Sequence, residues 1–203
     1  MTIATAEPKQ AKGKLKKVYT PQEYLALEEK AEDKHEYRNG EIVAMAGGTT
    51  NHNEIVTNLC TALKVALKGQ HYRVFISDVR LWIPRYNQYT YPDVMVIAGE
   101  PIYHQGQASI TNPLLIVEVL SPSPQDYDRG TKFTYYRSIS QLQEYILVDQ
   151  YSVKIEQFSK ISQGQWLLTE YEANSENLMV ESLKLPLNIV DIYDQVEFES
   201  CSP

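Results

Sequence analysis

One carboxylate lies within a strongly apolar segment of the sequence. The segment reads NPLLIVEVLSPSP, residues 112–124, and its only acid is Glu118. A run of this kind, rich in β-branched residues and ended by alternating serine and proline, is typical of a central strand covered on both faces. An unpaired ionised carboxylate would cost several kcal/mol there. We therefore expect Glu118 to lie at the exposed end of the strand, to pair with a cation, or to bind a metal ion.

A second acid lies near the start of another apolar run. Asp93 belongs to YPDVMVIAG, although a Pro-Asp pair can simply begin a strand. If the two strands are neighbours, the carboxylates of Asp93 and Glu118 project at the same place. Their oxygens are the type of ligand that Mg²⁺ and Mn²⁺ prefer, and Mg²⁺ usually takes only one or two carboxylates from a protein. The pair is therefore a candidate metal site.

A lysine follows on a helix-like segment, DRGTKFTYYRSI, residues 128–139. Two acids and Lys132 around a divalent ion would suit phosphodiester cleavage. The ion polarises the phosphate and lowers the pKa of a bound water, while the ammonium group positions that water or stabilises developing charge. Arg129, Lys132 and Tyr136 recur at helical spacing, as expected if one face overlooks a polar cleft. The alternative is an ordinary solvated face, with Tyr136 used only for packing.

Helix and hairpin signals precede these segments. The run Thr20–Glu23 combines an N-cap, a proline at the first helical position and a glutamate three residues after the cap, so a helix is expected over about 21–31. The pair Asn39-Gly40 between strand-like residues is the usual cue for a two-residue hairpin. Apolar residues at helical spacing predict a second helix around 55–67, with His52 in its first turn.

The remaining apolar segments of the sequence are predicted to form strands. Apolar runs occupy residues 73–84, 92–99, 113–121, 144–149, 152–159, 165–172 and 181–186. The later runs indicate an antiparallel meander that extends or flanks a mixed sheet, and the segment NIVDIY is expected to close it with a short helix. The predicted fold class is α/β (α+β), a mixed central sheet flanked by helices with a C-terminal antiparallel meander. The sequence has no glycine-rich phosphate loop, G-x-S-x-G elbow or H-E-x-x-H helix.

Length and charge limit the classes of function. With 203 residues, 43% of them hydrophobic, the chain can bury one core, so we expect a single domain at 19–203 after a basic tail at 1–18. A disordered tail is favoured over an arm that contacts phosphate. The net charge of −7 argues against general electrostatic coating of nucleic acid, and the acidic body would suit divalent cations.

The sequence also bears on the cellular setting. Its two cysteines have neither framework nor metal-ligand spacing, no apolar stretch approaches membrane-spanning length, and the N-terminus has no hydrophobic segment of the signal-peptide kind. We expect a cytoplasmic protein with no membrane partner.

At the residues singled out above, the sequence resembles the Uma-type restriction endonucleases, first catalogued as a domain of unknown function, within the PD-(D/E)XK nuclease superfamily. The resemblance extends from about Tyr19 to Asp149. It implies the first motif acid at Asp93 and the second at Glu118, whereas Leu120 occupies the usual lysine position. In the Uma-type group the lysine comes from the following helix. Lys132 matches that position, and Asp128 and Tyr136 also match the group's pattern.

The resemblance implies a restriction-endonuclease-like fold and a metal-dependent endonuclease that hydrolyses DNA. Asp93 and Glu118, with the Val119 carbonyl, would hold Mg²⁺ or Mn²⁺, and Lys132 would orient the attacking water. Glu36 would help to bind a second ion or orient Lys132. The residues expected around them, in a polar shell or in contact with substrate, are Asp78, His52, Arg129 and Tyr136. A homodimer is the simplest arrangement for cutting both strands.

Plainer interpretations exist for the outer residues and for the function. Glu36 could pair across strands, Asp78 could pair with Arg80 or Arg73, and His52 on an apolar stripe could be a core histidine. The scaffold could also bind nucleic acid or a protein without cutting. Hydrolysis of another substrate, such as a glycoside, would use the same carboxylates. Lys132 argues against that last reading, because such sites rarely need a cation facing the leaving group.

Overall fold

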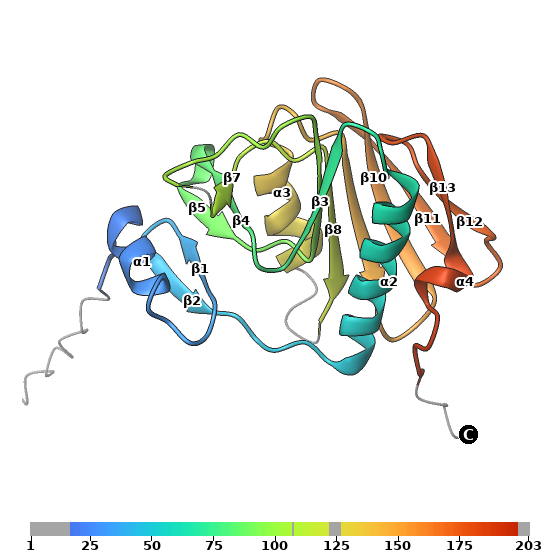
Figure 1. Ribbon diagram of the computed structural model, residues 1–203, viewed down its shortest axis with the longest axis horizontal. Helices are drawn as coiled ribbons and strands as arrows, with labels where there is room; N and C mark the ends of the chain where they lie inside the picture. The colour runs from blue at the N-terminus through green and yellow to red at the C-terminus, as the bar shows by residue number, and fades with distance from the viewer. Residues whose placement is uncertain (1–16, 107, 122–126, 199–203) are drawn as a thin grey trace, which may run out of the picture.

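The computed structural model describes residues 17–106, 108–121 and 127–198. Most of the predicted basic tail, the Ser-Pro-Ser-Pro loop after Ser121, and Cys201 lie outside these residues. The described chain forms a six-stranded sheet, a five-stranded sheet and a two-stranded hairpin, with helices against the sheets (Figure 1). No helix in the described ranges is long and apolar enough to cross a membrane.

The six-stranded sheet carries the two candidate acids. Its strand order is β11-β10-β9-β8-β6-β3, and only the pair β8 and β9 is parallel, so the sheet is mixed as predicted. Its strands are β3 (Tyr72–Ile76), β6 (Val94–Ala98), β8 (Leu115–Leu120), β9 (Glu144–Asp149), β10 (Lys154–Ser162) and β11 (Gln165–Glu172). All six residues of β8 are buried, Glu118 among them. The meander β9-β10-β11 extends the sheet as its sequence predicted.

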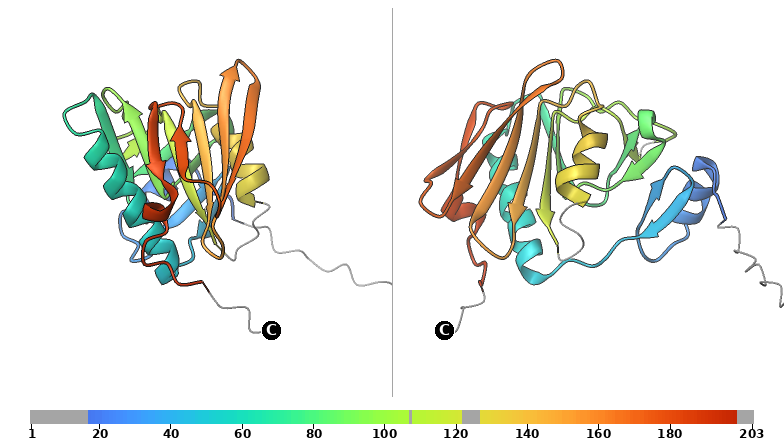
Figure 2. Two further views of the ribbon diagram at one scale, coloured as in Figure 1. Left: turned by 90° about the vertical axis from the view of Figure 1, so that its right-hand side faces the viewer. Right: turned by 180° about the vertical axis from the view of Figure 1, so that it is seen from behind.

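Helices cover both faces of this sheet, as the two views of Figure 2 make clear. Thr49 caps α2 (Thr50–Ala66), and its buried face packs in one core cluster with Val117 and Val119. The π-helical segment η2 (Tyr127–Lys132) and α3 (Phe133–Tyr136) lie on the opposite face, where Ile116 and Leu120 pack. Because strand side chains alternate between faces, Glu118 points to the η2–α3 side.

The five-stranded sheet has the order β2-β1-β5-β4-β7. Its strands are β1 (His35–Arg38), β2 (Glu41–Ala44), β4 (Arg80–Ile83), β5 (Gln88–Thr90) and β7 (Ser109–Ile110), with the 3₁₀ turn η1 (Pro84–Tyr86) between β4 and β5. Asn39 and Gly40 join β1 to β2 with φ values of 46° and 103°, the left-handed pair that a two-residue hairpin requires. The hairpin prediction is confirmed.

One predicted strand is wrong. Residues 73–84 were expected to form a single strand, but the chain turns between Ile76 and Arg80. The first part becomes β3 of the six-stranded sheet, whereas the second becomes β4 of the five-stranded sheet. Polar residues at Ser77 and Asp78 mark the break, because both favour turns. The second sheet arises from this division.

The N-terminal helix α1 (Pro21–Glu28) begins with the predicted capping box between Thr20 and Glu23, although it ends before the predicted residue 31. Its Tyr24 is buried in an aromatic cluster with Tyr37, Trp82 and Tyr89. This cluster fixes the helix on one face of the five-stranded sheet.

The C-terminal region pairs β12 (Asn177–Val180) with β13 (Leu185–Asn188) and ends in α4 (Ile189–Ile192), the short helix expected at NIVDIY. The strand predicted at 181–186 is wrong in its bounds. A turn occupies 181–184, and Lys184 within it has a left-handed φ of 51°.

Candidate active site

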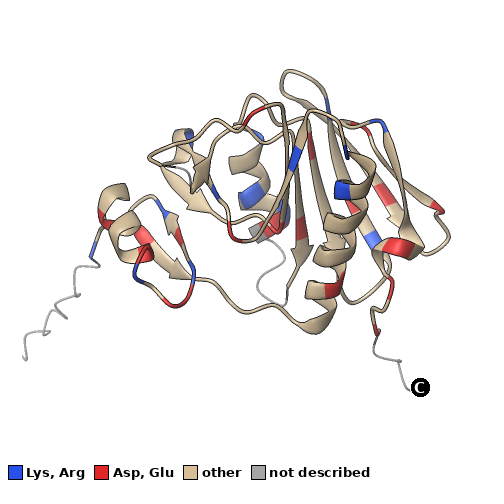
Figure 3. Cartoon of the chain, viewed as in Figure 1, with Lys and Arg blue, Asp and Glu red and all other residues tan. Residues whose placement is uncertain are grey.

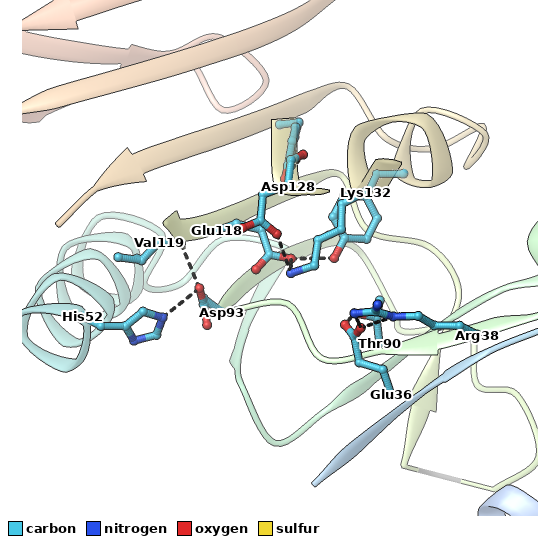
Figure 4. A network of polar contacts seen from close by, with 11 residues as sticks. Glu36, Arg38, His52, Thr90, Asp93, Glu118, Val119, Asp128 and Lys132 are labelled. Atoms are coloured by element: carbon cyan, nitrogen blue, oxygen red, sulfur yellow. Dashed lines mark hydrogen bonds and ion pairs between the residues drawn. The ribbon is translucent and has the colours of Figure 1, made fainter. Parts of the chain in front are cut away.

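Asp93 immediately precedes β6, and Glu118 lies in the adjacent antiparallel strand β8. Val94 pairs with Val117, so Asp93 lies level with Glu118. Oδ2 of Asp93 accepts a hydrogen bond of 2.8 Å from the Val119 backbone N–H and lies 3.1 Å from Nε2 of His52. The strand register and the first turn of α2 therefore both fix the Asp93 carboxylate (Figure 4).

Glu118 is more deeply buried than Asp93, with only 3% of its surface exposed. Its Oε1 accepts a hydrogen bond of 2.5 Å from the Tyr136 hydroxyl and lies 3.2 Å from Nζ of Lys132. Burial raises the pKa of Glu118 to about 8; the charges of Asp93 and Asp128 also raise it, against the opposing effect of Lys132 and the Tyr136 bond. Because this pKa already includes the effect of Lys132, a further cation would be needed to keep the carboxylate fully ionised at neutral pH.

Lys132 is held between two acids. Its Nζ lies 3.0 Å from Oδ1 of Asp128 as well as 3.2 Å from Glu118, and its side chain is 14% exposed. Burial by itself lowers the pKa of Lys132, but the charges of Glu118 and Asp128 raise it more, and the net pKa lies above the ordinary value. Lys132 is therefore an ammonium group at neutral pH. Figure 3 shows acidic and basic residues meeting at this end of α3.

The shape of η2 brings these groups together. Asp128 and Lys132 lie four positions apart in a π-helical turn, a geometry that occurs mostly as short insertions within α-helices and is frequent at functional sites. The following helix turn buries Tyr136 completely beside Glu118. Burial and the Glu118 charge raise the pKa of the Tyr136 phenol well above its usual value, so the phenol remains a neutral donor.

Comparison with known proteins gives the family. Residues 21–189 match the Uma2 family model, described as "Putative restriction endonuclease". The chain belongs to this family. Every acid and base described above lies within the matched range of the Uma2 family.

Two similar proteins of Synechocystis sp. (strain ATCC 27184 / PCC 6803 / Kazusa) have been named without a function. "Uncharacterized protein sll1609" is 43% identical over 170 residues, which is 83% of this chain and 96% of that protein. "Uncharacterized protein slr1290" is 40% identical over 179 residues, or 88% of this chain and 93% of that protein.

The fold is also similar to a crystal structure described as that of "a putative nuclease belonging to DUF820" from Anabaena variabilis ATCC 29413. The TM-score is 0.71 at 20% identity, and the alignment covers 88% of this chain and 99% of that chain. This likeness establishes a nuclease-like fold for the Uma2 chain.

A second polar group faces the acid–lysine cluster from the five-stranded sheet. Oε2 of Glu36 accepts hydrogen bonds from Nε of Arg38 at 2.9 Å and Nη2 at 2.6 Å, while Oε1 accepts one from the Thr90 hydroxyl. The Glu36 charge raises the pKa of both Lys132 and Tyr136. Glu36 therefore acts on Lys132 through its charge, whereas Asp128 and Glu118 form the ion pairs with that lysine (Figure 4).

Two residues expected around the site lie elsewhere. Asp78 is in the β3–β4 turn with its side chain 77% exposed, and it pairs with Lys34 rather than with Arg73 or Arg80. Arg129 pairs with Glu156 of β10 at 2.9 Å. Arg129 is therefore engaged with the strand β10, and the regular helix expected at this point is a π-helical turn.

Three contributors to the site had no role assigned from the sequence, although two of them had a signal. Asp128 precedes Lys132 by four residues, the spacing of a helical ion pair. Arg38 follows Glu36 by two, so both project from the same face of β1. Thr90 had no local signal, because its contact with Glu36 depends on the pairing of β1 with β5.

The donor set fits a hard divalent cation with few protein ligands. No group of three or more His, Cys, Asp or Glu in the described parts of the chain is arranged to hold a metal. Asp93 and Glu118 nevertheless supply two carboxylates close enough for the charge of Asp93 to raise the pKa of Glu118. That repulsion would be relieved by a cation between them, and Mg²⁺ commonly takes one or two carboxylates with water completing its coordination. The role of the Val119 carbonyl as a ligand stays a prediction.

Proposed function

We propose that this Uma2 protein is a metal-dependent endonuclease that hydrolyses DNA phosphodiester bonds. The observation that carries the proposal is the position of Lys132, whose Nζ lies 3.2 Å from Glu118 at the point where Asp93 and Glu118 adjoin on neighbouring strands. Two carboxylates and an ammonium group on this nuclease-like fold are the parts that phosphodiester hydrolysis requires.

In this proposal Asp93 and Glu118, with the Val119 carbonyl, hold Mg²⁺ or Mn²⁺. When bound, the ion supplies polarisation of the scissile phosphate and a lowered pKa for water. His52 and the Val119 N–H keep Asp93 in place, and the Tyr136 hydroxyl does the same for Glu118.

Lys132 has the electrostatic role. Because its pKa lies above the ordinary value, it remains protonated and cannot serve as the base. Its ammonium group instead donates hydrogen bonds, which orient the attacking water and stabilise negative charge that builds on the phosphate oxygens. Water forms the new P–O bond and gives up one proton to solvent as the bond to the leaving sugar oxygen breaks, and that oxygen takes up a proton from solvent.

The test is a cleavage assay on the purified full chain with supercoiled plasmid, linear duplex, single-stranded DNA and RNA, each with Mg²⁺, Mn²⁺ or EDTA. We expect cleavage of DNA that requires the ion and is lost in Asp93→Asn. The matched control is Glu100→Gln, since Glu100 lies just beyond the other end of β6 with its side chain 80% exposed. Cation binding without cleavage of any substrate would favour a non-catalytic binding module instead.

A further inference from the structure

A pocket of about 260 Å³ lies away from the acid–lysine cluster. It is bounded by the end of α1 and the loop after it, by the β3–β4 turn, and by Tyr91 and Ala108. Leu81 and Ile83 of β4 pack beside Tyr136 on the catalytic side, whereas Trp82 packs in the aromatic cluster under α1. Alternation along β4 places Arg80 with Trp82, so the pocket opens on the opposite face of the five-stranded sheet.

Arg80 gives this pocket its chemistry. The residue lines the pocket and is only 9% exposed, yet its guanidinium makes no hydrogen bond or ion pair with any residue that the structure describes. Only its backbone is bound, through the N–H that donates to the Ala108 carbonyl at 3.1 Å. The guanidinium nitrogens are not among the fully enclosed polar atoms without a partner in the described chain, so water in the pocket reaches them. An anionic group of a ligand could take the place of that water.

The other charges near Arg80 are already engaged or lie at the rim. Glu28 accepts hydrogen bonds from the Tyr91 hydroxyl at 2.9 Å and from the His35 backbone N–H at 2.9 Å. Lys34 pairs with Asp78 and so joins the loop after α1 to the β3–β4 turn. The exposed rim acids are Glu29, Glu32 and Asp33. Among its described lining residues, the pocket therefore has one cation without a hydrogen-bonded partner, the buried and already bonded carboxylate of Glu28, and exposed carboxylates at its edge.

We propose that this pocket binds a small zwitterion with the chemistry of a free amino acid. The carboxylate of the ligand would accept two parallel hydrogen bonds from the planar guanidinium of Arg80, whose geometry suits a carboxylate. The ammonium group of the ligand would face the rim acids. Those same acids would repel a phosphate dianion. The positive charge of Arg80 would repel a simple amine. The pocket is at the small end of ligand sites, which limits the occupant to a small molecule.

Binding is tested on the full chain by calorimetry and thermal shift, without metal or DNA, so the outcome is separate from that of the nuclease proposal. The probes are glycine, alanine and serine as zwitterions, acetate as an anion, methylamine as a cation, and inorganic phosphate. We expect saturable binding of at least one zwitterion, at least about fivefold weaker binding of acetate, and none of methylamine or phosphate. No saturable binding of any zwitterion overturns the proposal.

Substitutions at Arg80 assign the site. Arg80→Met should weaken zwitterion binding at least about tenfold and leave the protein without probe about as stable as wild type, because no hydrogen bond or ion pair of the guanidinium with a described residue is removed. Arg80→Lys keeps the charge without the planar fork and should bind with intermediate affinity; it decides the question if the Met variant does not fold. The control is Arg85→Met, an exposed arginine in η1. Binding that survives both Arg80 variants overturns the proposal.

Discussion

Nζ of Lys132 lies 3.0 Å from Oδ1 of Asp128 and 3.2 Å from Oε1 of Glu118. One ammonium group thus joins an acid of the π-helical turn to an acid of the central sheet. The lysine that the superfamily motif places on the second acidic strand is absent here, since that position is Leu120. The segment η2, which lies outside the sheet, instead places the ammonium group of Lys132 beside Glu118.

Asp128 is expected to position Lys132. Asp128→Asn removes one of the two ion pairs described for Nζ, and a small displacement of a positioning group can cost as much as 100-fold in rate. We predict that the variant keeps its affinity for Mn²⁺ but cleaves DNA about 10-fold to 100-fold more slowly. Steady-state cleavage and Mn²⁺ titration measure the two effects separately, with the exposed Asp191→Asn as control. An equal loss of metal affinity would instead make Asp128 a ligand.

Binding of a divalent cation should release a proton from Glu118. Its pKa of about 8 leaves the group mostly protonated at pH 7, whereas a metal requires the carboxylate. The apparent affinity for Mg²⁺ is predicted to rise about tenfold per pH unit from pH 6 to pH 8 and then to level off. Calorimetry in buffers of different ionisation enthalpy counts the released proton. An affinity independent of pH over this range would contradict the assignment.

The same group should make stability depend on pH. The pKa of Glu118 is about 8 in the folded chain and 4.5 ordinarily. Between pH 4.5 and pH 8, the folded chain therefore holds a proton on Glu118 that the unfolded chain has released. The free energy of unfolding contributed by Glu118 is therefore largest below about pH 4.5 and is lost as pH rises toward 8.

Urea unfolding in EDTA measures this contribution. The stability of wild type relative to Glu118→Gln is expected to fall as pH rises through the window from 4.5 to 8. A relative stability that stays level, or increases with pH, would show that Glu118 is ionised in the folded protein throughout.

Tyr136→Phe isolates one hydrogen bond to Glu118. The ring stays in its buried place, but the 2.5 Å bond from the hydroxyl to Oε1 is lost. Leaving a buried acceptor short of a partner should cost about 1–3 kcal/mol in urea unfolding. Because that bond lowers the pKa of Glu118, the pH midpoint of Mg²⁺ binding should move upward. Tyr103→Phe, at an exposed tyrosine, should change neither quantity.

The sequence predicted features that depend on local chemistry. The Asn39-Gly40 hairpin and the Thr20 capping box formed as expected, because left-handed turn residues and N-caps act within a few positions. The apolar run around Glu118 likewise became a fully buried strand. Asp93 and Glu118 came together because their strands are neighbours in the sheet.

Most features that depend on distant pairings were not predicted, and the approach of Asp93 to Glu118 was predicted only on the condition that their strands are neighbours. The division of 73–84 between two sheets is decided by the partners of β3 and β4, which no local pattern encodes. The contact of Thr90 with Glu36 has the same origin. The π-helical turn that holds Asp128 and Lys132 was also missed, because periodicity does not separate it from a regular helix. Arg129 within this turn pairs with Glu156.

The most direct test of the proposed catalytic centre is the anomalous diffraction of a crystal soaked with Mn²⁺. We predict one strong anomalous peak between the carboxylates of Asp93 and Glu118, absent from crystals of Asp93→Asn and present in those of Glu100→Gln. A peak elsewhere, or carboxylates that keep their contacts with His52 and Lys132 and bind no ion at saturating Mn²⁺, would contradict it.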